Sequence, residues 1–188
     1  MGETFKSILS SVVNKRYEDL VKENSRAIST SFKLCSFSER NDSMLMWAHY
    51  ASYHQGFCIE YDIESIPYTD YRRRFLYPTI YSDFMFDATE YYKIGVEDEN
   101  FNNLYLSMVG LVKGKEWQYE KEWRLVFSHE ILEKEKSYVW GKSKAVYLGS
   151  KIEISDQDML IEICNDKDIP IFKMKAHHNK FLLEVTDL

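Results

Sequence analysis

Carboxylates and a guanidinium recur at a spacing of two residues in the stretch Trp117–Phe127. Glu120, Glu122 and Arg124 stand two positions apart there, between aromatic and aliphatic residues. Side chains two apart on a β-strand point to the same face, so this spacing predicts two carboxylates and a guanidinium in one row. Such a row suits a catalytic or ligand-binding site, and it equally suits a charge ladder on the solvated face of a sheet.

A second stretch, Leu34–Asp62, holds other polar side chains that could do chemistry. Burying such groups without partners costs free energy, so we expect them to face one another or a ligand. The two stretches are therefore predicted to meet in one polar cleft, with Glu122 as the catalytic carboxylate and Arg124 holding an anionic substrate or neutralising the carboxylates. The other residues expected in this cleft are Glu39, His49, Tyr50, Glu60 and Glu120.

The elements that must position these residues can be predicted from the spacing of the apolar residues. Alternation predicts strands over Leu34–Ser38, Phe57–Tyr61 and Glu122–Phe127, and helical spacing predicts a helix over Met44–Tyr53. We expect the three strands to belong to one sheet, with the helix packed on it.

Several single residues indicate how the predicted helix begins, ends and packs. Asp42 or Ser43 can cap its first turn, and Gly56 is expected to end it in the left-handed conformation. Trp47 and Trp123 are expected to be core residues. A histidine beside the apolar stripe of a helix, such as His49, is also typical of a hydrogen-bonded packing residue.

The chain as a whole is predicted to fold as α+β, with a mixed, largely antiparallel sheet of about five to seven strands and flanking helices. Residues 1–30 are expected to be a helical segment and residues 31–188 a single α+β domain. Further predicted elements are helices over 5–26, Leu104–Lys113 and the stretch capped by Ser155, an edge strand containing Pro78, and strands over Ala145–Gly149, Pro170–Lys175 and Lys180–Val185.

Composition restricts the compartment and the partners. The 188 residues include 45% hydrophobic residues and carry a formal charge of −6, which disfavours a general nucleic-acid coat. Three cysteines without paired spacing fit a reducing compartment, and no signal peptide or membrane span is evident. We expect a cytoplasmic protein that does not enter membranes and that binds a small nucleotide or a protein partner.

Four strings of residues carry a resemblance to a known family. They are Phe37–Glu39 (FSE), Met46–Ala51 (MWAHYA), His54–Asp62 (HQGFCIEYD) and Trp117–Arg124 (WQYEKEWR). The chain resembles a bacterial family known as domain of unknown function 2971. This resemblance implies no established activity, but it implies a setting among mobile-element or phage-defence genes. Members usually carry an Asn-Asp-Pro turn before the first string; this chain has none and is expected to be shortened at that end.

The layout of the two stretches is also similar to that of ADP-ribosyltransferases. That similarity implies Ser36 or Ser38 as the serine of the nicotinamide-ribose site, Glu122 as the catalytic glutamate and Glu120 as its partner, with NAD as cofactor. His49 remains a further catalytic candidate. Such enzymes place a His or Arg on an earlier strand, where this chain is predicted to be helical.

Two alternatives stay open beside the transferase. The first is a non-catalytic module whose aromatic and acidic surface binds a ligand or a partner. The second is a nuclease-like effector that would hold a divalent cation with Glu60, Asp62, Glu120 and Glu122, although no spacing here selects a metal site.

Overall fold

The computed structural model of this protein describes residues 10–16, 18–19, 22–23, 26, 32–88, 104–128 and 141–188. Residues 10–16 are helical, which agrees with the helix predicted over 5–26, although much of that helix lies outside the described residues. Among the described residues, no helix combines the length and the apolar content needed to cross a bilayer.

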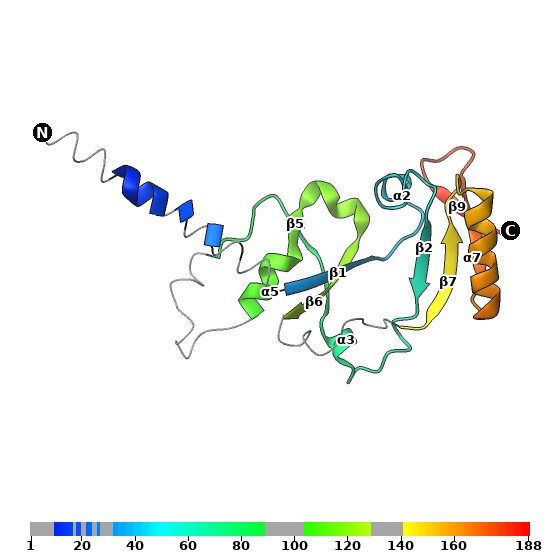
Figure 1. The fold of residues 1–188 in the computed structure, drawn as a ribbon, viewed down its shortest axis with the longest axis horizontal. Helices are drawn as coiled ribbons and strands as arrows, with labels where there is room; N and C mark the ends of the chain where they lie inside the picture. The colour runs from blue at the N-terminus through cyan, green and yellow to red at the C-terminus, as the bar shows by residue number, and fades with distance from the viewer. Residues whose placement is uncertain are drawn as a thin grey trace, which may run out of the picture.

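Two separate sheets dominate the fold (Figure 1). The β1 sheet has the order β1-β6-β3 and is antiparallel, with strands β1 (Phe32–Ser38), β6 (Glu122–Ser128) and β3 (Leu76–Pro78). The β2 sheet has the order β2-β7-β8-β9, with strands β2 (Phe57–Tyr61), β7 (Ser143–Leu148), β8 (Ile171–Ala176) and β9 (Leu183–Thr186). Only β7 and β8 run parallel in that sheet.

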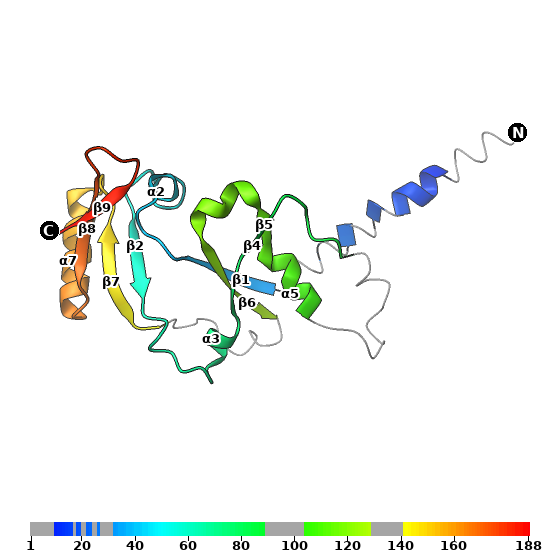
Figure 2. The ribbon, with the colours of Figure 1, turned by 180° about the vertical axis from the view of Figure 1, so that it is seen from behind.

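Helices and one short strand pair complete the described structure. The elements are α2 (Met44–Tyr50), α3 (Tyr71–Arg74), α5 (Leu104–Leu111), the 3-10 helix η1 (Lys115–Glu120), α7 (Ile154–Asp166) and the parallel pair of β4 (Ile80–Ser82) and β5 (Val112–Gly114). Figures 1 and 2 show α7 on the outer face of the β2 sheet. They show α2 beside one end of β2, on the side that faces the β1 sheet. The α+β prediction is confirmed.

β7 is buried on both of its faces. On one face Tyr147 packs with Trp47 of α2, and on the other Leu148 packs with Cys164 of α7. Strands that are apolar on both faces are typical of sheets that are covered on both sides. β7 has β2 and β8 as its neighbours, and β2 is the edge strand of this sheet among the described residues.

The prediction that three strands share one sheet is wrong for Phe57–Tyr61. β1 and β6 are neighbours as predicted, with Ser38 opposite Glu122, but Phe57–Tyr61 pairs with β7 in the other sheet. The reason is the burial of β7, because alternation within a strand predicts its faces but not its neighbours.

The helix after Ser43 is shorter than predicted. Ser43 caps α2 as expected, but the helix ends at Tyr50, and the left-handed residues are Ser52, Tyr53 and His54 rather than Gly56. Glycine is needed at position 56 for space, since a Cβ atom there would lie 3.2 Å from the Ala51 Cα atom.

Three further boundaries differ from the sequence prediction. Lys115–Glu120 forms η1 instead of the start of a strand, and left-handed Lys121 (φ 46°) turns the chain into β6. The helix predicted to Lys113 ends at Leu111, and α7 begins after Glu153 without a Ser155 cap. The edge position predicted for the strand with Pro78 is confirmed in β3.

Trp47 is more deeply buried than Trp123. The Trp47 side chain is 4% exposed and its Nε1 donates to the Asn41 carbonyl at 2.6 Å, whereas half-buried Trp123 donates to exposed Glu39. We expect Trp47→Ala to lower the free energy of unfolding by about 3–5 kcal/mol. Urea unfolding followed by circular dichroism measures this. Trp123→Ala is the matched control and should cost clearly less; equal losses would contradict the assignment of Trp47 to the main core.

Candidate functional site

Two carboxylates and two cations meet where β5, η1 and β6 come together. Glu120 ends η1 and Glu122 begins β6, while Lys113 lies on β5 and Arg124 lies two residues further along β6. Tyr50 reaches this group from α2. We call these five residues the carboxylate cluster.

Glu122 has a charged partner for each of its oxygens. Its Oε1 accepts from Arg124 Nε at 2.9 Å, and its Oε2 accepts from Lys113 Nζ at 2.8 Å and from the Arg124 terminal nitrogen at 3.1 Å. The residue is 6% exposed, and its backbone amide donates to the Tyr81 hydroxyl at 2.8 Å. Two cations therefore enclose the side chain expected to be catalytic.

Glu120 is bound in a similar way, although it belongs to a helix rather than a strand. It is 3% exposed, its Oε2 accepts from Lys113 Nζ, and its Oε1 accepts from the Tyr50 hydroxyl at 2.7 Å. Its backbone carbonyl accepts from the Ser38 hydroxyl at 2.6 Å. The ammonium group of Lys113 thus bridges both glutamates. Glu120 and Glu122 are close together as predicted, but through this shared cation and not because they lie on one face of a strand.

The charge states of the cluster follow from these contacts. Burial raises the pKa of Glu122, but hydrogen bonds from Arg124, Lys113 and Ser36 outweigh it and hold the pKa at about 2. Burial lowers the pKa of Lys113, and its bonds to both glutamates reverse this effect and raise it above its usual value. Burial and the bond to Glu120 raise the pKa of Tyr50 to about 12. At neutral pH, Glu122 and Lys113 are charged and Tyr50 keeps its proton.

A cleft of about 680 Å³ lies between the two sheets. Its lining comes from β1, from the loop after β1, from α2 and from β2, with one residue from the turn after β2 and one residue of β7. These residues are Cys35, Ser36, Phe37, Ser38, Glu39, Arg40, Asn41, Met46, Cys58, Ile59, Glu60, Tyr61, Ile63 and Tyr147. We call this space the inter-sheet cleft. Glu120, Glu122 and Arg124 do not line it.

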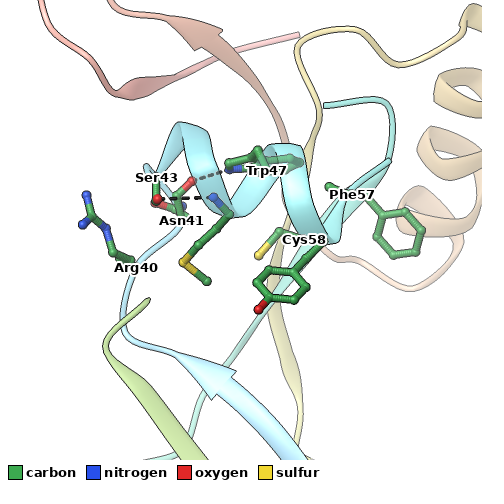
Figure 3. Close-up of a pocket in the computed structure, with 9 residues that line it drawn as sticks. Arg40, Asn41, Ser43, Trp47, Phe57 and Cys58 are labelled. Carbon is green, nitrogen blue, oxygen red and sulfur yellow. Dashed lines mark hydrogen bonds between the residues drawn. The ribbon is translucent and has the colours of Figure 1, made fainter. Parts of the chain in front are cut away.

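A smaller cavity of about 160 Å³ adjoins the inter-sheet cleft. Arg40, Asn41, Met46 and Cys58 line both spaces, and Trp47 of α2 forms part of the smaller one. Figure 3 shows Arg40 and Phe57 at opposite ends of this cavity, with α2 passing between them. We call it the side pocket.

The sequence-predicted site residues divide between these two places. Tyr50, Glu120, Glu122 and Arg124 belong to the carboxylate cluster, whereas Glu39 and Glu60 line the inter-sheet cleft. The single polar cleft expected from the sequence is therefore not formed, because β2 and β6 belong to different sheets.

Three other candidates lie at or near the boundary between the two places. Ser36 and Ser38 line the inter-sheet cleft and also bond to Glu122 and to the Glu120 carbonyl, respectively. His49 is exposed, with its ring centroid 6.3 Å from that of Trp117.

The four carboxylates considered for a divalent cation do not converge. Glu60 accepts from Tyr147 and pairs with Lys144 at 2.7 Å, and Asp62 accepts from two backbone amides of the following turn. Within the described ranges, no three metal-ligating side chains come together. The nuclease-like arrangement is thus not supported by the positions of these residues.

Sequence reasoning missed Lys113, Tyr147 and Cys58 as members of the two places. The sequence predicts Lys113 as the last residue of a helix. The available signal for its role is that two buried glutamates near the start of a strand require a cation. The sequence predicts Tyr147 within a strand, and only the pairing of β7 with β2 reveals that its hydroxyl donates to Glu60.

Comparison with known families gives one match, and the matched segment includes residues of the carboxylate cluster and of the inter-sheet cleft. Residues 46–125 match the model of a family described as protein of unknown function (DUF2971). Over this segment, the chain is similar to the DUF2971 family. The DUF2971 segment begins in α2 and ends in β6, and it includes Glu120, Glu122 and the β2 side of the inter-sheet cleft. No curated protein and no solved structure matches the chain.

The bonds to Glu122 predict a distinct pH dependence of stability. Its pKa is about 2 in the folded protein against 4.5 as the reference value, so its contribution is present above about pH 4.5 and is lost as the pH falls toward 2. We expect Glu122→Gln to lower the free energy of unfolding by about 3 kcal/mol at pH 7, because Lys113 and Arg124 lose their partner.

Urea unfolding at several pH values measures this dependence. The difference between Glu122→Gln and the parent should narrow below about pH 4.5, where the parent glutamate becomes protonated on unfolding. Glu116→Gln, which changes an exposed carboxylate of η1, is the control and should leave stability nearly unchanged. A Glu122→Gln loss that is constant from pH 7 to pH 3 would contradict the charged cluster.

Proposed function

We propose that this protein is a non-catalytic binding module that holds a small molecule or a short segment of a partner in the inter-sheet cleft. The observation that carries the proposal is the cleft of about 680 Å³, whose lining combines hydroxyls, carboxylates and aromatic rings from both sheets. Cavities of this size, with apolar walls and a few polar groups, are typical of ligand sites.

The state of the carboxylate cluster supports binding over catalysis by Glu122. A catalytic carboxylate must contact the reacting atoms. The Glu122 side chain is 5% exposed, and both of its oxygens are occupied by Lys113 and Arg124. Within this proposal the cluster has a structural role. Its bonds with Tyr50 and Ser38 connect η1 to α2 and β1, which form part of the cleft wall.

The proposal predicts that filling the inter-sheet cleft abolishes ligand binding. Cys35 is exposed and lines the cleft, while Lys33 lies two residues away on the same face of β1 and does not line it. We expect Cys35→Trp to block binding and Lys33→Trp to preserve it. Thermal-shift measurements with nucleosides, NAD, ADP-ribose, amino acids and short peptides provide the test.

At least one of these compounds should raise the unfolding midpoint of the parent and of Lys33→Trp, but not that of Cys35→Trp. A panel without any shift, or a shift that persists in Cys35→Trp, would reject the inter-sheet cleft as the binding site.

One observation favours an ADP-ribosyltransferase-like reaction as a second candidate. The Ser36 side chain hydrogen-bonds to Glu122 across neighbouring strands, which brings together two residues that the similarity to these transferases assigns to one site. Release of nicotinamide from NAD tests this candidate. If the transferase reading holds, the parent should release nicotinamide and Glu122→Gln, compared at equal folded concentration, should not. No release by the parent, or equal release by both, would reject it.

A further inference from the structure

We infer that the ligand of the inter-sheet cleft is an extended peptide segment that adds to the free edge of β2. This inference rests on the proposed function and names the ligand class for the same site. In the part of the chain that the structure describes, β2 pairs with β7 alone and β1 pairs with β6 alone. On the other edge of β2, the backbone groups of Phe57 and Ile59 have no ladder partner among the described residues.

The lining of the cleft indicates that it runs along these edges. Four consecutive residues of each strand line it, Cys35–Ser38 and Cys58–Tyr61. Consecutive residues of a strand point to opposite faces, so a cavity can contact all of them only by following the strand edge. The space is consequently bordered by backbone groups as well as by side chains.

The ladder pattern identifies the backbone groups that face the cleft. The Gly149 amide donates to the Gly56 carbonyl at 2.8 Å, and hydrogen-bonded positions alternate along an antiparallel pair. Cys58 and Glu60 therefore bond to β7, whereas the amides and carbonyls of Phe57 and Ile59 point away from it. An unpaired strand edge of this kind is a template for an added strand.

The two cavities follow one another along β2. Phe57 and Cys58 border the side pocket, and Cys58 to Tyr61 border the inter-sheet cleft. A strand added to β2 would pass both, with one apolar side chain in the side pocket against Met46 and Trp47. Recognition by strand addition combines backbone hydrogen bonds with such pockets for alternate side chains.

The charges of the cleft indicate a basic residue in the peptide. Arg40 pairs with Asp42 at 2.6 Å, and Glu60 pairs with Lys144 at 2.7 Å. Among the described lining residues, Glu39 is the carboxylate whose partner is neutral, the Trp123 indole at 2.6 Å. A lysine side chain on the peptide would complement this charge.

The experiment uses a set of hexathreonine peptides with an acetylated N-terminus and an amidated C-terminus. In each peptide one threonine is replaced by leucine and another by lysine, and the set covers every combination of the two positions. Fluorescence polarisation with the full chain identifies the best binder. N-methylation of its amides, one at a time, should weaken binding by about tenfold at every second position and much less between them. Replacing its lysine by norleucine should weaken binding to the parent and to Glu64→Gln, an exposed control, but not to Glu39→Gln.

The outcomes separate this inference from the proposed function. Binding that Cys35→Trp abolishes but that N-methylation leaves unchanged would overturn strand addition and keep the cleft as the site. No binding by any hexapeptide would also overturn strand addition, while the small-molecule panel would still decide on the cleft. If N-methylation weakens peptide binding at every second position and Cys35→Trp abolishes binding, strand addition and the inter-sheet cleft as the binding site are both supported.

Discussion

Burial of β7 on both faces is the constraint on which the rest of the structure depends. α2 covers one face through Trp47, and α7 covers the other through Cys164. β7 lies inside its sheet with β2 as one neighbour, so β2 belongs to a different sheet from β1 and β6. The inter-sheet cleft is the space left between two sheets that are separated in this way.

The carboxylate cluster holds together elements that form the wall of the same cleft. Lys113 bridges Glu120 and Glu122, and the Tyr50 bond to Glu120 connects this charged group to α2. Two buried carboxylates are paired here with two cations, which reduces the free-energy cost of burying them. The charged pattern that first suggests catalysis thus has a structural explanation. Polar side chains that line the inter-sheet cleft lie on β1, on the loop after it and on β2.

The sequence allowed the strands and their faces to be predicted, but not their neighbours. Alternation indicated β1, β2 and β6, and Ser43 indicated the start of α2. The site was harder to predict for two physical reasons. The neighbour of β2 depends on the burial of a distant strand, and the meeting of Glu120 with Glu122 depends on the left-handed turn at Lys121, a residue with no special preference for that conformation.

The most direct measurement of the central claim is amide hydrogen exchange of the ligand-free chain, resolved residue by residue along β2 by NMR. The account predicts an alternation: slow exchange at Cys58 and Glu60, which bond to β7, and fast exchange at Phe57 and Ile59, whose amides point away from β7. Equally slow exchange at all four amides would mean that the outer edge of β2 is already paired, and it would contradict an open cleft between the two sheets.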